Sequence, residues 1–349
     1  MKLLHSADWH LDSPFQGRTP DQSAYLKEQL LTVPGKIAAL CRGEGCQMML
    51  LSGDLFDGPY ARQSLETMKN ALEEAAVPVF IAPGNHDYVG GHSPWGREAF
   101  PGNVHIFSRP ALESVTLPSL DCRVYGAGYD SPDCPPLLQS FRADCRERFA
   151  VGILHGDPVQ TASPYCPITR AQAEDTGLDY LALGHIHKRG QFRAGGTLCA
   201  WPGCPMGRGF DEAGVMGAYV VDLEETAQAV FHPLDTPRFY DLKADVNQGL
   251  SCVLPPVGNR DFYRVTLTGE GENVDLSALA AEFPEFPNLQ LRDGTLPPMD
   301  LWAGAGEDTL EGVYFDLLRQ AVKEQDADTV RLAAKISRQL LDGREVKLP

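Results

Sequence analysis

The sequence of 349 residues contains no apolar run near the length of about 20 residues that a membrane-spanning helix needs. Its first residues, MKLLHSADWH, hold one lysine and a very short apolar run before Asp8, so no secretory signal peptide is expected. The nine cysteines include no C-x-x-C pair, which argues against a disulfide framework and a cysteine-based zinc site. We therefore expect a cytoplasmic protein with reduced thiols and no membrane association.

Positive charge is also scarce, because 30 Lys and Arg residues against 47 Asp and Glu residues give a formal net charge of −17. A uniformly acidic chain is repelled by nucleic acid and by most phosphorylated polymers. Any phosphate substrate must therefore meet local positive charge, either on a basic loop or on bound metal.

Short apolar runs alternate with amphipathic segments in the first part of the chain. The runs are residues 3–4, 48–51, 77–82, 151–154 and 180–183, and the helix-like segments are residues 23–41 and 62–76. Such alternation indicates β-α-β units. Strand-like runs follow each other over residues 104–127 and 197–231, so we expect an α/β protein with two packed β-sheets flanked by helices.

Each of the five apolar runs ends in a cluster of polar residues. The clusters are Asp8-Trp9-His10, Gly53-Asp54-Leu55-Phe56-Asp57, Gly84-Asn85-His86-Asp87, His155-Gly156 and Gly184-His185-Ile186-His187. One such cluster alone, after Pro-Gly, would be typical of a turn. Because ligands at the carboxyl ends of neighbouring strands converge on one crevice, the five together predict a shared site. His5 lies inside an apolar run and is expected to be a buried core residue.

The side chains of these clusters favour a metal site. Imidazole combined with carboxylate suits Mn, Fe, Zn or Ni better than Mg or Ca, which prefer oxygen ligands. Seven ligands exceed the needs of one four-coordinate ion and suit two ions that share a carboxylate, about 3.5–4 Å apart. The seven candidates are Asp8, His10, Asp54, Asn85, His155, His185 and His187.

The motifs resemble those of the calcineurin-like metallophosphoesterases over roughly residues 1–235. Within that family, MKLLHSADWHLDSPF, GDLFD, PGNHD, LHGD and LGHIHKRG are most similar to bacterial DNA-repair exonucleases of the SbcD and YhaO type. The run from Trp201 to Glu212, with the pattern P-G-x-P-x-G-R-x-F, supports this resemblance. The resemblance implies the metallo-dependent phosphatase fold in residues 1–234. Residues 235–349 are expected to form a smaller C-terminal α+β capping or partner-binding region that ends in a helical hairpin.

The resemblance also implies a role for each motif residue. Asp8, His10 and His187 would hold one metal ion, Asn85, His155 and His185 would hold the other, and Asp54 would bridge them. His86 would be the catalytic histidine, and Asp87 would orient it. Asp57 departs from relatives that have histidine there, and we interpret it as an acceptor that supports a ligand histidine.

The function implied by the resemblance is a DNA exonuclease or endonuclease of the double-strand-break repair type. Two divalent ions, of which Mn²⁺ fits best, would direct hydroxide attack on a phosphodiester. Residues 186–210 carry basic residues and no acidic one, so they are either a solvated loop or a contact to backbone phosphates. The candidate substrate-binding residues in this stretch are Lys188, Arg189 and Arg208.

Two other functions stay open at this point. One is a phosphoesterase for a small molecule or nucleotide on the same fold. The other is an adaptor that keeps the fold and binds a partner without catalysis, although the intact ligand motifs argue against it. The expected partners are DNA, an SMC-like coiled-coil ATPase and a second copy of the chain in a homodimer. Two amphipathic segments, with Leu310 and Leu332 on their apolar faces, either pack on their own domain or dock the ATPase.

Overall fold

The computed structural model describes residues 1–90, 92–144, 146–256, 260–271, 274–343 and 346. The chain forms two units, one of residues 1–241 and 258–264 and the other of residues 242–257 and 265–349. The division of the chain into domains at residue 234 stays a prediction.

The first unit contains two β-sheets, as the sequence predicted, and each sheet has six strands. The first sheet has the order β12-β11-β1-β2-β3-β4, and the second has the order β5-β6-β7-β8-β10-β9. In the first sheet the strands are β12 (Ala227–Pro233), β11 (Gly217–Leu223), β1 (Lys2–Ser6), β2 (Met49–Leu51), β3 (Val79–Ile81) and β4 (Val104–Ile106). In the second they are β5 (Glu113–Leu117), β6 (Cys122–Gly126), β7 (Phe149–His155), β8 (Tyr180–Gly184), β10 (Thr197–Trp201) and β9 (Gly190–Ala194).

Parallel pairing dominates the centre of both sheets. Strands β1 to β4 pair in parallel, with Leu4 opposite Met49 and Met49 opposite Val79. Strands β6, β7, β8 and β10 also pair in parallel. The carboxyl ends of β1, β2 and β3 therefore lie at one edge of the first sheet, and those of β7 and β8 lie at one edge of the second.

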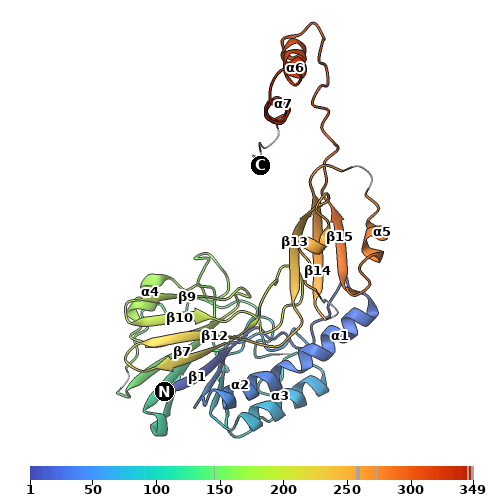
Figure 1. The fold of residues 1–349 in the computed structure, drawn as a ribbon. Helices are drawn as coiled ribbons and strands as arrows, with labels where there is room; N and C mark the ends of the chain where they lie inside the picture. Colours follow the sequence, from blue (N-terminus) through green and yellow to red (C-terminus); the bar gives the residue numbers. More distant parts are fainter. Residues whose placement is uncertain (91, 145, 257–259, 272–273, 344–345, 347–349) are drawn as a thin grey trace. The chain divides into compact units, whose positions relative to one another are not determined.

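The alternation of side chains along β1 shows how the layers pack. Leu3 belongs to a buried cluster with Leu50 and Val151, which joins the inner faces of the two sheets. Leu4 points to the other face, into a cluster with Val33 and other residues of the helices. Those helices are α1 (Pro20–Leu31), α2 (Val33–Gly43) and α3 (Arg62–Ala75), while α4 (Arg170–Asp175) lies on the second sheet's side (Figure 1).

The segment 23–41, expected as one helix, is two helices. Helix α1 ends at Leu31 and α2 begins at Val33, and Thr32 is the cap residue of both. Pro34 explains the break, because proline inside a continuous helix lacks the N–H group and clashes with the carbonyl four residues earlier. In the first turn of α2 it meets neither problem.

The second unit contains the three-stranded sheet β13-β14-β15 with one short helix and two longer ones (Figure 1). Its elements are β13 (Phe239–Asp245), β14 (Phe262–Thr268), α5 (Leu276–Ala281), β15 (Leu289–Asp293), α6 (Leu310–Ala321) and α7 (Ala327–Leu341), and β13 and β14 begin in the first unit. Asp326 caps α7 by accepting a hydrogen bond from the backbone of Thr329. No helix in the described part of the chain is both long and apolar enough to cross a membrane.

Candidate metal centre

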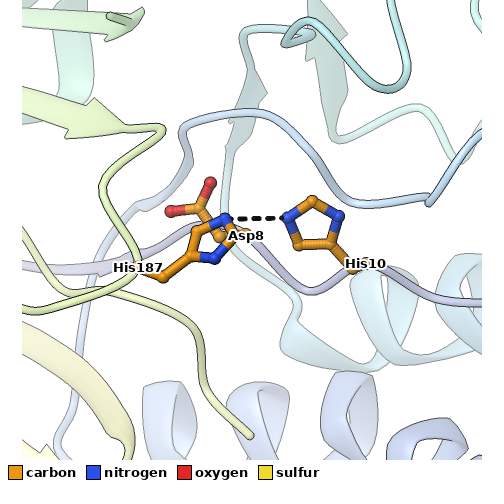
Figure 2. Close-up of side chains that lie close together, drawn as sticks. All are labelled: Asp8, His10 and His187. Carbon is orange, nitrogen blue, oxygen red and sulfur yellow. Dashed lines mark hydrogen bonds between the residues drawn. The ribbon is translucent and has the colours of Figure 1, made fainter. Parts of the chain in front are cut away.

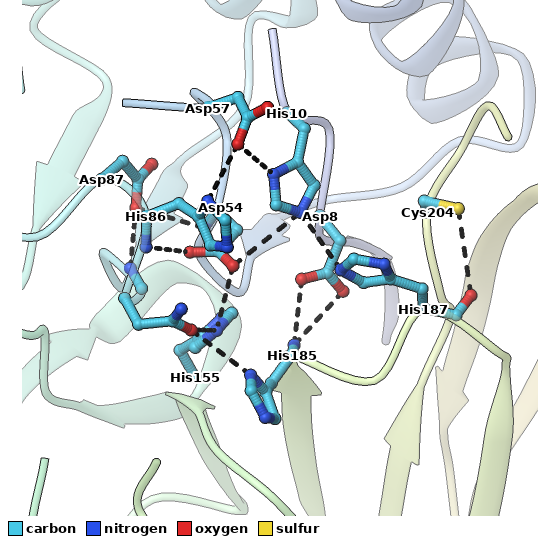
Figure 3. A network of polar contacts seen from close by, with 12 residues as sticks. Asp8, His10, Asp54, Asp57, His86, Asp87, His155, His185, His187 and Cys204 are labelled. Carbon is cyan, nitrogen blue, oxygen red and sulfur yellow. Dashed lines mark hydrogen bonds and ion pairs between the residues drawn. The ribbon is translucent and has the colours of Figure 1, made fainter. Parts of the chain in front are cut away.

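The polar clusters that follow β1, β2, β3, β7 and β8 meet at one place (Figure 3). Backbone hydrogen bonds tie the first two together, because the Asp8 N–H donates to Gly53 O at 3.0 Å and the His10 N–H donates to Asp54 O at 2.9 Å. The second sheet joins them through the His185 N–H, which donates to Asp8 Oδ1 at 3.0 Å. The two sheets thus contribute side chains to a single site.

Several residues at this site have left-handed backbone conformations. The φ angles are 55° at Asp8, 48° at His10, 51° at Asp54 and 95° at His185. A non-glycine residue in this region carries strain of about 1–2 kcal/mol, which the surrounding structure must offset. Such strain gathered on four candidate ligands is typical of a functional site.

One group of possible ligands consists of Asp8, His10 and His187, called here the Asp8 cluster (Figure 2). The Nε2 atoms of His10 and His187 lie 3.1 Å apart. Two imidazole lone pairs at this distance repel each other unless a proton or a metal cation lies with them. The buried carboxylate of Asp8 completes the cluster.

A second group consists of Asn85, His155 and His185, called here the Asn85 cluster. Asn85 Oδ1 lies 2.9 Å from His155 Nε2 and 3.3 Å from His185 Nδ1. Asp54 lies between the two clusters, since its Oδ2 is 3.4 Å from His155 Nε2 and 3.8 Å from His10 Nε2. The structure therefore brings together all seven of the residues that the motifs indicated.

The hydrogen bonds of two histidines favour the tautomer that a metal ligand needs. The Nδ1 of His155 lies 2.9 Å from the Ser52 carbonyl oxygen, and the Nδ1 of His187 lies 2.7 Å from Glu212 Oε1. The Nδ1 of His10 is 3.4 Å from Asp57 Oδ1 and makes no hydrogen bond within the described part of the chain. An acceptor at Nδ1 favours the proton there and leaves the Nε2 lone pair facing the other ligands. Imidazole nitrogens, carboxylates and an amide oxygen form a donor set suited to transition-metal ions.

Burial favours neutral imidazoles in this site. It lowers the pKa of His10, His155 and His185, so all three are deprotonated near neutral pH and free to act as ligands. For His187 burial also opposes the charge, but the hydrogen bond with Glu212 and the charge of Asp8 raise its pKa above the ordinary value.

The two carboxylates respond differently to the same surroundings. Burial raises the pKa of Asp8. Burial acts in the same direction on Asp54, but the neighbouring imidazoles of His155 and His10 outweigh it and lower its pKa. Asp54 is therefore the better anion, which suits a carboxylate shared between two cations.

The expected orientation of His86 by Asp87 is wrong. His86 Nδ1 lies 2.8 Å from Asp57 Oδ1, whereas the carboxylate of Asp87 accepts from the backbone N–H groups of Asp54, Leu55, Phe56 and Gly84. Asp87 follows His86 in the chain but is buried under the loop after β2, and burial raises its pKa to about 7. It holds that loop in place, and Asp57 is the residue that reaches His86.

The three basic candidates lie in different surroundings. Lys188 is exposed. Arg189 is exposed as well, but its guanidinium donates to Val215 O at 3.1 Å and lies over the Phe231 ring. Arg208 is only partly exposed and pairs with Glu212 beside the Asp8 cluster. Of these three residues, Lys188 is the one whose exposed side chain is best placed to contact a phosphate group.

Glu212 is a residue of this site that the sequence reasoning missed. It follows His187 by 25 positions, and no strand-end motif marks it. The sequence feature that could have pointed to Glu212 is the run from Trp201 to Glu212. That run supported the family resemblance, but no role was assigned to its last residue. His5, by contrast, is the buried core residue expected, with ring nitrogens 2.7 Å from Tyr180 Oη and 2.9 Å from Ser52 Oγ.

Comparisons with known proteins show the family to which the chain belongs. Residues 1–189 match the model of the family described as calcineurin-like phosphoesterase, which is more than half of the chain. The chain belongs to the calcineurin-like phosphoesterase family, whose members use divalent metal ions. It has the fold of that family, with two mixed sheets flanked by helices.

Among curated proteins, the chain is 34% identical over 238 residues to the uncharacterized metallophosphoesterase YhaO of Bacillus subtilis, covering 63% of this chain and 57% of that one. It is 22% identical over 275 residues to the SbcD component of the nuclease SbcCD from the same organism, covering 66% of this chain and 68% of that one. A solved dimetal phosphatase from Danio rerio is similar with a TM-score of 0.41 and 12% identity, covering 66% of this chain and 98% of that chain. The chain thus spans little more than half the length of YhaO.

Proposed function

We propose that the chain is a metal-dependent phosphodiesterase that cleaves DNA, as an exonuclease or endonuclease of the double-strand-break repair type. The observation that supports this best is the position of Asp54, whose carboxylate faces nitrogen ligands of both clusters. The relative SbcD is named as part of a nuclease, which favours a nucleic acid as the substrate class. The resemblance of the strand-end motifs to DNA-repair exonucleases favours DNA within that class.

The two clusters would hold one divalent ion each, with Asp54 shared between them. The Asp8 cluster offers one carboxylate and two imidazoles, and the Asn85 cluster offers one amide oxygen and two imidazoles. Nitrogen-rich sites of this kind favour transition metals over Mg²⁺, and Mn²⁺ is our choice of cofactor. When bound, such ions supply positive charge for the phosphate oxygens and activate water.

His86 would serve as the proton donor to the leaving oxygen. Its side chain is 45% exposed and its Nδ1 lies 2.8 Å from Asp57 Oδ1, so the opposite nitrogen, Nε2, is the one that would face a substrate. The hydrogen bond with Asp57 raises the pKa of His86, which favours the protonated ring that donation needs. Asp57 would hold both this ring and the ring of His10.

DNA would reach the centre along the basic stretch after β8. Lys188 follows the ligand His187 directly and is exposed, so its ammonium group can contact a backbone phosphate. Since the whole chain is acidic, such a contact and the metal charge would have to offset the general repulsion of DNA.

The exposed apolar side chains of α6 and α7 are our candidate docking surface for a coiled-coil ATPase partner. Val313 is 51% exposed, Leu317 60% and Leu340 64%, which leaves apolar area unpaired on this helical hairpin. The relative SbcD is named as one component of a larger nuclease, SbcCD. We also propose a cytoplasmic location, and a homodimer stays an open expectation.

The test is a cleavage assay on two substrates. Purified protein with Mn²⁺ is incubated with linear duplex DNA and with bis(p-nitrophenyl) phosphate, and Asp54→Asn and a chelator serve as controls. The proposal predicts Mn²⁺-dependent cleavage of both substrates, with both activities lost in Asp54→Asn. Cleavage of the small diester without any of DNA would favour a small-molecule or nucleotide phosphoesterase. Absence of both activities in metal-loaded protein would favour a non-catalytic adaptor.

A further inference from the structure

We propose that Glu212 is a positioning residue that sets the metal affinity of the Asp8 cluster, and that Arg208 holds Glu212 in place. This inference rests on the metal centre of the proposed function and does not depend on DNA as the substrate. It gives Arg208 a role inside the centre, in place of the contact to DNA that the sequence suggested.

Both oxygens of the Glu212 carboxylate make close polar contacts. Oε1 lies 2.7 Å from His187 Nδ1 and accepts from Arg208 Nη2, also at 2.7 Å. Oε2 accepts from the Arg208 backbone N–H at 2.8 Å and from Arg208 Nε at 3.3 Å. These four contacts use both carboxylate oxygens, and the buried Cys204 thiol is a further hydrogen-bonding neighbour of Glu212. With only 8% of its surface exposed, Glu212 has little access to solvent.

These contacts keep Glu212 charged in spite of its burial. Burial would raise its pKa, but the hydrogen bonds with His187 and Arg208 hold the pKa well below its usual range. Because Glu212 Oε1 lies 2.7 Å from His187 Nδ1, it can accept the Nδ1–H and so favour the tautomer with the lone pair on Nε2. That nitrogen is the one that lies 3.1 Å from His10 Nε2 in the Asp8 cluster.

Arg208 also approaches Asp57, the carboxylate beside His10 in the Asp8 cluster. Its Nη1 lies 3.9 Å from Asp57 Oδ2, and Asp57 in turn lies beside the Nδ1 atoms of His10 and His86. One guanidinium therefore stands between the two carboxylates that support the histidines of this site. Its positive charge reduces the repulsion between Asp57 and Glu212, so it stabilises both in the ionised form.

The experiment measures metal binding, because Glu212 contacts no substrate in this proposal. Mn²⁺ is titrated into metal-free wild-type protein and into Glu212→Gln by calorimetry. Loss of a carboxylate that supports a metal-bound histidine typically costs roughly 10–100-fold in affinity. In Glu212→Gln we expect this loss of affinity for one of the two Mn²⁺ ions, the one bound by the Asp8 cluster. The other Mn²⁺ ion should bind as tightly as in the wild type.

Glu147→Gln is the matched control. Glu147 pairs with Arg123 at 3.0 Å, and its side chain is 14% exposed, so the change removes a similar half-buried ion pair outside the site. We expect both Mn²⁺ equivalents to bind to this variant as they do to the wild type. The melting temperature of each metal-free variant shows how much of any change is structural.

Two results would overturn the role of Glu212. Unchanged binding of both equivalents would show that Glu212 does not tune the cluster. Equal weakening of both equivalents, together with a lower melting temperature than Glu147→Gln shows, would make Glu212 a structural residue only. If the wild-type protein binds no Mn²⁺, the proposed metal centre is refuted, and the role proposed for Glu212 is refuted with it.

Discussion

At the scale of single residues, the pair formed by His86 and Asp57 offers a test of the proton donor. His86→Asn removes the donor without removing a ligand of either cluster. We expect turnover to fall roughly 10²–10⁴-fold while two equivalents of Mn²⁺ still bind. Steady-state kinetics on bis(p-nitrophenyl) phosphate, with calorimetry on the same sample, checks both parts. Loss of metal in His86→Asn would show that His86 is a ligand.

The pH dependence of turnover in Asp57→Asn gives a further test of His86 as the proton donor. The Asp57 carboxylate raises the pKa of His86, so the protonated ring persists to higher pH than an ordinary histidine would allow. A group with a raised pKa keeps its charged form below that pKa and loses it as the pH rises through it. Without the carboxylate the pKa falls, and the alkaline limb of turnover at saturating Mn²⁺ should move to lower pH. An unmoved alkaline limb would assign it to another group.

Lys188 offers a second test at this scale, because it separates DNA binding from chemistry. Lys188→Ala should weaken DNA binding and reduce the slope of log affinity against log salt by about 0.9, the value for one phosphate contact on duplex DNA. Cleavage of the small diester should stay unchanged, since that substrate does not reach the loop. Lys27, exposed on α1, is the control substitution. A parallel fall in both activities would favour the small-molecule phosphoesterase.

At the scale of elements, Gly184 at the end of β8 decides how closely the two sheets meet. A Cβ atom built there would lie 2.0 Å from Ser52 O and 3.0 Å from His155 Nδ1. Gly184→Ala must therefore push the end of β8 away from β2 and disturb the contact between His155 and Ser52. We expect a loss of about 1–3 kcal/mol in the free energy of unfolding, together with weaker binding of one Mn²⁺ equivalent.

Gly196→Ala is the control for this change, because among the described residues no atom outside Gly196 and its two chain neighbours lies within 4 Å of a Cβ at that position. Denaturant unfolding and calorimetry on the two variants give the comparison. If Gly184→Ala unfolds and binds metal like Gly196→Ala, the close approach of β8 to β2 is not what shapes the Asn85 cluster.

The hairpin of α6 and α7 is the other element that can be tested alone. Tyr314 Oη and Ser337 Oγ lie 2.7 Å apart, and Arg338 pairs with Glu311, so polar contacts join the helices while Leu317 stays 60% exposed. Leu317→Arg should abolish pull-down of the proposed ATPase partner and leave hydrolysis of the small diester unchanged. Arg331→Ala, an exposed change on α7, should affect neither. Normal pull-down by Leu317→Arg would refute docking through this face.

At the scale of the whole molecule, the fold and the gathering of the seven candidate ligands could be predicted from the sequence. Parallel strands place their carboxyl ends at one edge, so residues such as Asp8, Asp54 and His185 meet although they are far apart in the chain. The partners of the histidines could not be predicted in this way. Glu212 reaches His187 from 25 positions away, and Asp57 reaches His86 from the loop of another strand. These contacts depend on how loops cross the end of the sheets, which periodicity and spacing do not encode.

The same reasoning explains the one wrong partner. Asp87 is next to His86 in the chain, and adjacency suggested a contact. The backbone turn after β3 instead sends Asp87 inward, where it accepts from N–H groups of the loop after β2. A sequence motif therefore identified the chemistry of this segment but not the direction of each side chain.

The measurement that tests the central claim most directly is the number of Mn²⁺ ions in fully active protein. The account predicts two ions per wild-type chain and the loss of both, together with activity, in Asp54→Asn, because Asp54 faces both clusters. Metal analysis after gel filtration, combined with turnover of the same sample, gives this number. At most one ion in a fully loaded and active sample, or two ions that persist in Asp54→Asn, would contradict the shared-carboxylate centre.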